Sequence, residues 1–320
     1  MPSAALPDPD DDTKKQPTTT ISPSVVESVA GFSAGAISCL FVHPLDLLKN
    51  RLQLNTRTAS RPGDSVRILR EVIRDEGGLR ALYRGLWPNM LGNTLGWSFY
   101  FLFYRNLKEL MHAGQEQREH LSSAEIFAAS GLAGLFTAAC TNPIWVVKTR
   151  MLERGANHPE AYRSMWSGLK HVYNTRGLRG LWSGFIPSTF GVAHGAVQFA
   201  IYEKMKNGRG DQIGGKQNLS TWDFIYMSAA SKFMAGVITY PYQPIRARMQ
   251  QYDAANQYTG LIDVFRKTYR NEGLLAFYKG VVPNTLRVLP TTMITFIVYE
   301  KTRLYLPKLF VDEQMAHEED

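Results

Sequence analysis

The stretch PLDLLKNR, residues 44–51, decides the fold, because the chain repeats its pattern twice more. It returns as PIWVVKTR at residues 143–150 and as PYQPIRAR at residues 241–248, so that the three prolines lie 99 and 98 residues apart. A second pattern follows each copy in the same order: GLRALYRG at 78–85, GLRGLWSG at 177–184 and GLLAFYKG at 273–280. The period exceeds that of soluble solenoids, whose units run ~20–50 residues.

Long apolar segments flank these motifs. Four of them contain no Asp, Glu, Lys or Arg, and they cover residues 28–45, 86–104, 126–147 and 181–202. Two more, 224–245 and 281–299, are each interrupted by one cation, Lys232 and Arg287. A bilayer-spanning helix needs ~20 mostly apolar residues. The sequence therefore predicts six spanning helices, although the mean hydropathy of the whole chain is only −0.21.

The connection after each proline motif is rich in Arg and Lys. In the first connection, apolar and basic residues alternate at helical spacing: Val66, Leu69, Val72 and Ile73 with Arg67, Arg70 and Arg74. This pattern predicts a short helix at the membrane surface. By the positive-inside rule, the proline motifs face the matrix or cytosol. A net charge of +8 favours anionic partners.

The repeats also predict the domain organisation. We expect a disordered tail over residues 1–22, three repeats over 23–120, 121–217 and 218–308, and a C-terminal tail over 309–320. The first tail is rich in Pro, Asp, Ser and Thr, so it lacks the composition of a transit peptide. Two cysteines, Cys39 and Cys140, sit in apolar segments and predict no disulfide framework.

The three proline motifs resemble the tripartite signature of the mitochondrial carrier family: proline, any residue, an acid, two residues, a base, one residue, a base. The resemblance covers about residues 25–308. It implies an all-α membrane protein with six transmembrane helices in three pseudo-threefold repeats. Each repeat would add a short surface helix on the matrix side, and a gate would close each end of a central cavity.

The same resemblance implies a secondary transporter working by alternating access, and no enzyme. We expect no metal and no cofactor, a small anionic substrate, and membrane lipid as partner, with cardiolipin on the matrix side. Nucleic acid is not expected as a partner, and the protein should be a monomer. The resemblance places it in the mitochondrial inner membrane as a multi-pass protein, with the peroxisomal membrane as the alternative.

In this family, the acid of one proline motif pairs with the base of the next. Carried over, the rule predicts three matrix-gate contacts: an ion pair of Asp46 with Lys148, a cation–π contact of Trp145 with Arg246, and a hydrogen bond of Gln243 with Lys49. Only the first is an ion pair, so the resemblance implies a matrix gate weaker than one with three ion pairs.

Other positions fit the family's gates in part. Gln53 and Gln250 match its glutamine braces, whereas Leu152 stands at that position in repeat two. A cytoplasmic gate would use residues at the ends of the even-numbered spans: Lys108, Glu203, Lys206, Glu300 and Arg303. Arg105 replaces the expected acid in repeat one, so we expect at most two pairs there.

Two intramembrane cations point to a binding site. Lys232 lies eleven residues before Gln243, which is about 20° from the same helix face and roughly 16 Å along it. We prefer substrate binding to snorkelling for Lys232, because it lies mid-span. Arg287 is a functional candidate because a lone charge inside a membrane is costly.

Gly92, Gly191 and Arg287 each follow the last glycine of the second pattern by seven residues, where the family has its substrate contact points. Val192 completes a small-plus-aliphatic pair that resembles the adenine-binding position of nucleotide carriers. Asn93 and Trp97 would lie beside Gly92, and an aromatic ring suits a planar ligand. Close helix packing remains the alternative role of the glycines.

The PIW triplet of repeat two resembles the carriers of folate, flavin, nicotinamide and pyrimidine nucleotides. The PYQ triplet with Lys232 resembles the folate/FAD branch most closely. We expect FAD as the transported substrate, with folate, NAD or a pyrimidine nucleotide as alternatives within the group. A non-transporting membrane scaffold is the alternative from another class. Exchange and uniport both remain open.

Overall fold

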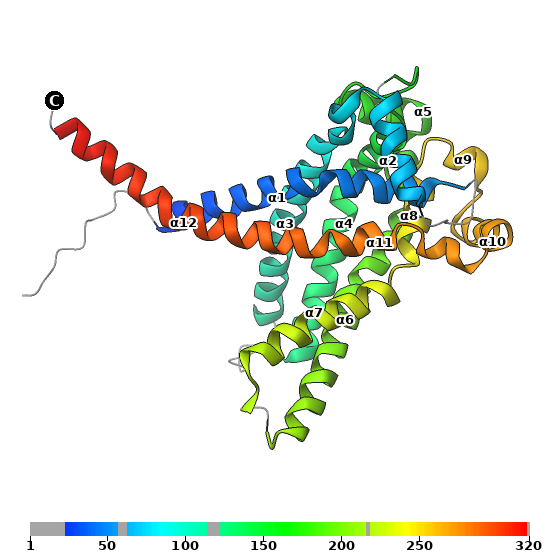
Figure 1. Cartoon of the computed structure of the whole chain (residues 1–320). Helices are drawn as coiled ribbons and strands as arrows, with labels where there is room; N and C mark the ends of the chain where they lie inside the picture. The colour runs from blue at the N-terminus through cyan, green and yellow to red at the C-terminus, as the bar shows by residue number, and fades with distance from the viewer. Residues whose placement is uncertain (1–22, 57–62, 114–121, 156, 216–217, 319–320) are drawn as a thin grey trace, which may run out of the picture. The chain divides into compact units, whose positions relative to one another are not determined.

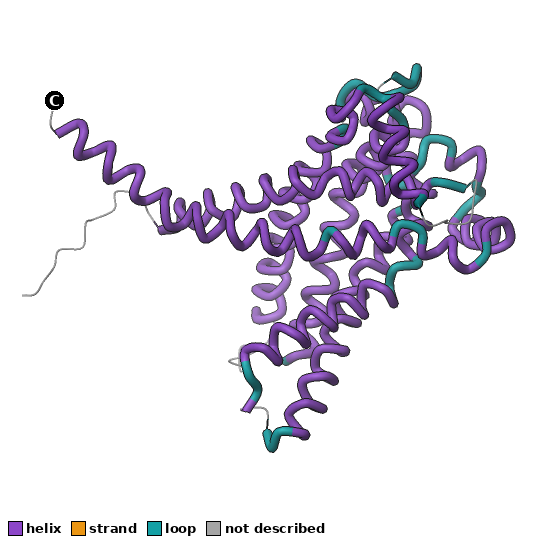
Figure 2. Tube along the Cα trace, in the orientation of Figure 1, coloured by secondary structure: helices purple, strands orange, loops and turns teal. Residues whose placement is uncertain are grey.

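The computed structural model describes residues 23–56, 63–113, 122–155, 157–215 and 218–318, and within these ranges it is helical with no strand (Figures 1 and 2). The first repeat contains α1 (Pro23–Leu54), α2 (Asp64–Asp75), η1 (Gly78–Tyr83) and α3 (Leu86–Ala113). The second contains α4 (Ser123–Glu153), α5 (Met165–Leu181) and α6 (Phe185–Gln212). The third contains α7 (Thr221–Ile238), α8 (Tyr242–Gln250), α9 (Ala254–Gln257), α10 (Leu261–Glu272), η3 (Leu274–Tyr278), α11 (Val281–Leu286) and α12 (Val288–Glu318).

The chain forms two compact units. The larger unit comprises residues 39–291, and the smaller one comprises the segment up to Ser38 together with the segment from Thr292. In the larger unit α3 packs along α4 and α6 packs along α7 (Figure 1). The predicted cavity residues and the matrix-gate residues all belong to this unit.

Proline shapes the long helices differently in the three repeats. Pro44 and Pro143 lie inside continuous helices, α1 and α4. In repeat three the helix is interrupted, since α7 ends at Ile238 and α8 begins just after Pro241. A second interruption separates α11 from α12 at Arg287. Pro290 has no backbone N–H to give to the carbonyl of Leu286, which explains this break.

The surface helices form as predicted. In α2, Ile68 and Val72 are buried while Val66 stays exposed, so one stripe of this basic helix faces the protein. The equivalent helices of the other repeats are α5 and α10. Together with three repeats and long apolar helices, they confirm the predicted all-α membrane fold.

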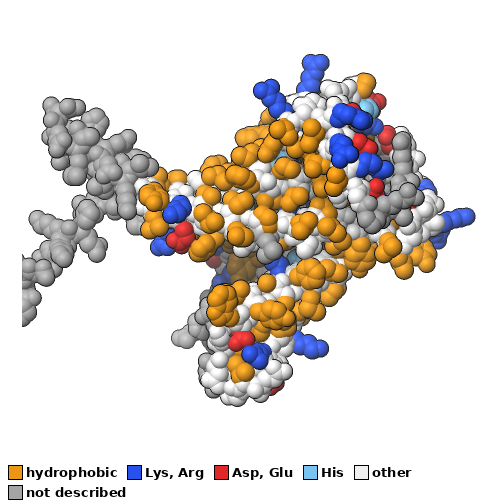
Figure 3. All heavy atoms as spheres, viewed as in Figure 1, with side chains coloured by type: hydrophobic (Ala, Val, Ile, Leu, Met, Phe, Trp, Pro, Cys, Tyr) orange, Lys and Arg blue, Asp and Glu red, His pale blue; other side chains and the backbone are white. Residues whose placement is uncertain are grey.

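Among the described residues, three helical stretches are long and apolar enough to cross a membrane: Val25–Leu54, Ala124–Glu153 and Leu274–Leu306. The helices α3, α6 and α7 fall short of that hydropathy, and they carry polar residues that line cavities, such as Asn93, His194 and Lys232. Many large apolar side chains remain exposed on the long helices, for example Phe136 and Phe199. Figure 3 shows hydrophobic side chains over much of the visible helix surface, as expected of a face that meets lipid.

Candidate functional site

Asp46 is the centre of a polar cluster in the larger unit. Its carboxylate forms an ion pair with Arg287 through Oδ1, and its Oδ2 lies 3.7 Å from Lys148 Nζ. Asn89 of α3 donates to the same Oδ2 at 3.1 Å and accepts from Lys148 Nζ at 2.6 Å. The side chains of Asp46 and Lys148 are 11% and 14% exposed, so water screens the pair weakly. The sequence anticipated Asp46 with Lys148 but missed both other partners.

Asn89 had a signal in the sequence. It follows Pro88, and a polar residue likewise follows the corresponding proline in the other repeats, Ser188 and Asn284. Asn89 is buried and also lies 3.3 Å from His43 Nδ1, while His43 Nε2 lies 2.8 Å from the carbonyl of Arg84. This chain of contacts connects the Asp46 cluster to the loop before α3.

Trp145 lies between two cations. Its ring centroid is 5.8 Å from Arg246 Cζ and 4.9 Å from Lys148 Nζ, and its indole N–H donates to Thr141 Oγ1 at 3.2 Å. A cation–π contact contributes ~0.5–2 kcal/mol depending on desolvation. The structure therefore brings Trp145 and Arg246 together as the family pattern implied.

The structure does not bring Gln243 and Lys49 into a hydrogen bond. Both side chains line the same cavity, but among the described residues no hydrogen bond joins them. The physical reason is the break in repeat three: Gln243 lies in the first turn of α8, where its backbone N–H donates to the carbonyl of Tyr240 at 2.9 Å. The family's pairing rule assumes the same helix geometry in all three repeats, and repeat three departs from it at this break.

The two glutamines of the predicted braces both bridge repeats. Gln53 Nε2 donates to the hydroxyl of Tyr240 at 3.0 Å, and that hydroxyl donates to the carbonyl of Lys279 at 3.0 Å. Gln250 Oε1 accepts from the hydroxyl of Thr149 at 2.9 Å. Leu152, at the third position, is 1% exposed and belongs to an apolar cluster with Leu47 and Leu82.

Replacing Leu152 with glutamine is expected to lower the free energy of unfolding by about 1–3 kcal/mol, because the amide would be buried among leucines without a partner. Denaturant unfolding of the purified protein in detergent measures this loss. Leu152→Met is the matched control, since it keeps the volume and should cost less than ~1.5 kcal/mol. A more stable Gln variant would contradict the apolar role of this position.

The residues proposed for the cytoplasmic gate make contacts only within their own helices in the described part of the larger unit. Glu203 lies 3.9 Å from Lys206, and Lys108 lies over the Tyr104 ring at 5.6 Å. In the smaller unit, Arg303 Nε lies 3.5 Å from Glu27 Oε1. The sequence placed Arg303 and Glu300 in this gate but did not point to Glu27 as a partner of Arg303.

Two cavities adjoin in the larger unit. The first, of about 420 Å³, is lined by the Asp46 cluster together with Lys232, His194, Tyr242 and Arg246. The second, of about 580 Å³, is lined mainly by small and aromatic residues. Its predicted members are all present: Gly92, Asn93, Trp97, Gly191 and Val192. Asn93 and Trp145 line both cavities, so the two spaces share a border.

The glycines of the second cavity differ in their surroundings. A Cβ on Gly92 would lie 3.2 Å from a ring carbon of Trp145, and one on Gly191 would lie 3.0 Å from the Tyr242 hydroxyl. These two glycines therefore allow aromatic side chains of neighbouring helices to pack closely. This agrees with close helix packing, the alternative role that the sequence left open for them. Gly96 and Gly195, in contrast, have nothing within 4 Å of the added Cβ, so they face open space.

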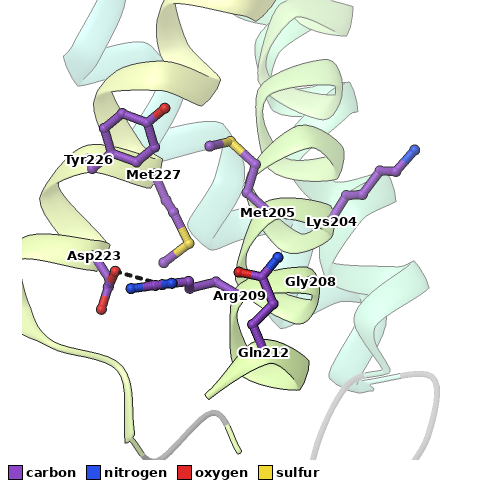
Figure 4. A pocket seen from close by; sticks show the side chains of 8 residues that line it. All are labelled: Lys204, Met205, Gly208, Arg209, Gln212, Asp223, Tyr226 and Met227. Carbon is purple, nitrogen blue, oxygen red and sulfur yellow. Dashed lines mark hydrogen bonds and ion pairs between the residues drawn. The ribbon is translucent and has the colours of Figure 1, made fainter. Parts of the chain in front are cut away.

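A further hollow lies between the ends of α6 and α7. Figure 4 shows its lining, in which Arg209 Nε donates to Asp223 Oδ1 at 3.1 Å. Asp223 also accepts from the backbone N–H of Ser220, so it caps α7 and ties it to α6. This hollow shares no lining residue with the two adjoining cavities.

The family comparison agrees with this architecture. The mitochondrial carrier protein family model matches three successive segments, residues 22–115, 119–212 and 217–309. The chain belongs to the mitochondrial carrier family. It is 35% identical over 297 residues to the mitochondrial FAD carrier protein of Saccharomyces cerevisiae, covering 87% of this chain and 96% of that protein.

Two plant relatives show similar identity. Nicotinamide adenine dinucleotide transporter 2, mitochondrial, of Arabidopsis thaliana is 36% identical over 282 residues, covering 85% of this chain and 77% of that protein. Folate transporter 1, chloroplastic, of the same plant is 36% identical over 287 residues, covering 85% and 92%. The chain is thus a membrane carrier whose relatives are named for different substrates and different organelles.

Proposed function

We propose that this carrier moves FAD across the mitochondrial inner membrane by alternating access. The observation that carries the proposal is the pair of adjoining cavities, one cationic and one lined by glycines and aromatic rings, which share Asn93 and Trp145. FAD joins a pyrophosphate to two planar ring systems, so its charged centre and a ring require neighbouring sites of these two kinds. The similarity to a yeast FAD carrier supports the same substrate.

The cationic cavity supplies the charge for a pyrophosphate. Lys232 lines it, and within the described residues its ammonium has no ion pair or hydrogen bond. Arg287 lines it as well, but its guanidinium is paired with Asp46. A bound phosphate would compete with Asp46 for the guanidinium of Arg287. Binding would thus weaken the ion pair of Asp46 with Arg287 and disturb the cluster that includes Lys148.

The two ends of the larger unit support an alternating mechanism. Near the proline motifs, Asp46, Lys148 and Trp145 join different repeats, whereas the contacts described for Glu203 and Lys206 all lie within α6. This arrangement corresponds to a carrier with its matrix gate closed. Alternating access requires that the contacts around Asp46 break when the opposite gate forms.

Reconstitution into liposomes tests the proposal. The purified full-length protein should take up radiolabelled FAD into vesicles loaded with FAD or left empty, and the two loadings separate exchange from uniport. Folate, NAD and pyrimidine nucleotides are tested in parallel. Uptake of NAD or folate without uptake of FAD would show that FAD is not the substrate. Uptake of none of these compounds would favour a non-transporting scaffold.

Lys232→Ala is expected to reduce FAD uptake at least ~10-fold, because a charge-assisted hydrogen bond to phosphate contributes about 1.5–3 kcal/mol. Initial uptake rates in liposomes measure the loss. Lys204→Ala is the matched control, since Lys204 is also on a long helix but lines only the separate hollow of Figure 4. Full activity in Lys232→Ala would remove this lysine from the site.

A further inference from the structure

The second base of each proline motif makes the same kind of contact in the three repeats. Arg51, Arg150 and Arg248 each donate from Nε to a backbone carbonyl of another repeat. The acceptors are Leu152 for Arg51, Gln250 for Arg150 at 3.1 Å, and Gln53 for Arg248 at 3.2 Å. The three arginines thus close a ring of contacts around the proline-motif end of the larger unit.

In repeats one and three a glutamate balances this arginine. Arg51 Nη2 lies 2.8 Å from Glu76 Oε2, and Arg248 binds Glu272 through both Nη atoms at 2.6 and 2.8 Å. Arg248 is fully buried, so its charge needs this partner. Burial alone would raise the pKa of Glu272, but hydrogen bonds from Arg248 and Lys279 outweigh it and lower the pKa.

Repeat two has no such acid. The corresponding residue is Arg176, directly before Gly177, as Glu272 is directly before Gly273. Arg150 is 2% exposed and donates from Nη1 to the Tyr162 hydroxyl at 3.2 Å, but its Nη2 has no hydrogen-bond partner in the described structure. Burial and then the charge of Arg150 lower the pKa of the Arg176 guanidinium, as expected for two close cations.

A cavity of about 640 Å³ lies beside these arginines. Besides Arg150 and Arg176, its lining includes a third arginine, Arg163, and the imidazole of His171. Its two acids, Glu160 and Asp253, are both engaged by Arg154, which is 3.1 Å from Asp253. Asp253 also acts on Arg176, but burial and the charge of Arg150 outweigh it, so the two acids only partly offset these cations. The cavity shares no lining residue with either substrate cavity.

We propose that this cavity is a second binding site, in which a phosphate group takes the place of the carboxylate that repeat two lacks. A phosphate oxyanion can accept paired hydrogen bonds from guanidinium groups, as Glu272 does from Arg248. The group comes either from a free phosphate compound on the proline-motif side or from a lipid headgroup. Its occupation would tie α5 to the end of α4, as Glu76 and Glu272 tie their connections in the other repeats.

The test is thermal unfolding of the full-length protein in detergent, titrated with sodium phosphate against sodium chloride at equal ionic strength. A separate arm compares micelles with and without cardiolipin. Phosphate or cardiolipin should raise the Tm of the wild type in a saturable way, because a ligand that binds only the folded state stabilises it. A response to phosphate identifies a free anion, and a response to cardiolipin alone identifies the lipid.

Arg176→Glu restores the acid of the other repeats. This variant should have a higher Tm without ligand, and it should bind phosphate or cardiolipin at least ~10-fold more weakly than the wild type. Arg179→Glu makes the same charge change on the exposed side of α5 and should keep the response. Lys232→Ala removes a cation of the transport cavity and should keep the part of the response that depends on Arg176.

Two results would overturn the second site. One is a wild type whose Tm responds to phosphate and cardiolipin no more than to chloride. The other is an Arg176→Glu variant that keeps the wild-type response. A response lost in Lys232→Ala and kept in Arg176→Glu would assign the phosphate to the transport cavity instead.

Discussion

Replacing Asp46 with asparagine is expected to abolish FAD uptake and to lower the free energy of unfolding by about 3–5 kcal/mol, the usual cost of removing one partner from a buried ion pair. Of the described residues that line the cationic cavity, Asp46 is the only acid, and it shares the lining with Lys49, Lys148, Arg246 and Arg287. Asparagine keeps the shape and one acceptor oxygen but leaves these cations without a counter-charge. Liposome uptake and denaturant unfolding measure the two effects.

A surface acid supplies the control for Asp46. Asp263 pairs with Lys267 at 2.9 Å within the surface helix α10, so Asp263→Asn should change stability by no more than ~1 kcal/mol. A double-mutant cycle with Arg287→Gln then isolates the Asp46–Arg287 pair. The double variant should be more stable than the sum of the two single losses predicts, with a coupling of about 0.5–3 kcal/mol. Strictly additive losses would mean that the pair is not formed.

The fold was accessible from the sequence because its determinants are local and repeated. Prolines, glycines and apolar segments recur at a period near 100 residues, and each acts on the backbone next to it. The contact of Asp46 with Lys148 was also accessible, since the threefold repeat assigns each acid to the following base. The polar position of Asn89 was visible in the repeats, but its bonds to Asp46 and Lys148 were not, because hydrogen bonding of a neutral side chain between helices depends on their packing.

Departures from threefold symmetry set the limit of prediction at the site. The pairing of Arg287 with Asp46 joins residues 241 positions apart in different repeats, and no repeat rule relates them. The break between α7 and α8 removed the expected contact of Gln243 with Lys49. In repeat one an extra glycine, Gly77, separates Glu76 from the shared pattern, so aligning the repeats by that pattern does not place Glu76 opposite Arg176. The missing acid at Arg176 became visible only from the ion pairs that Arg51 and Arg248 form with their glutamates.

Replacing Gly195 with leucine is expected to abolish FAD uptake while the protein remains folded. Gly195 lines the cavity of small and aromatic residues, and nothing lies within 4 Å of an added Cβ, so the leucine would extend into the space proposed for a ring of FAD. Its backbone is not in the left-handed region, and leucine favours a helix by roughly 0.5–1 kcal/mol over glycine. Uptake should therefore fall without a loss of Tm.

Gly131 provides the matched control. It lies on α4, also has nothing within 4 Å of an added Cβ, and lines neither cavity, so Gly131→Leu should transport FAD at the wild-type rate. Pyrophosphate adds a second readout, because it lacks the rings and needs only the cationic cavity. Gly195→Leu should lose stabilisation by FAD but keep stabilisation by pyrophosphate in a thermal shift measurement. Equal loss of both ligands would show that the two cavities do not divide the substrate between its rings and its phosphates.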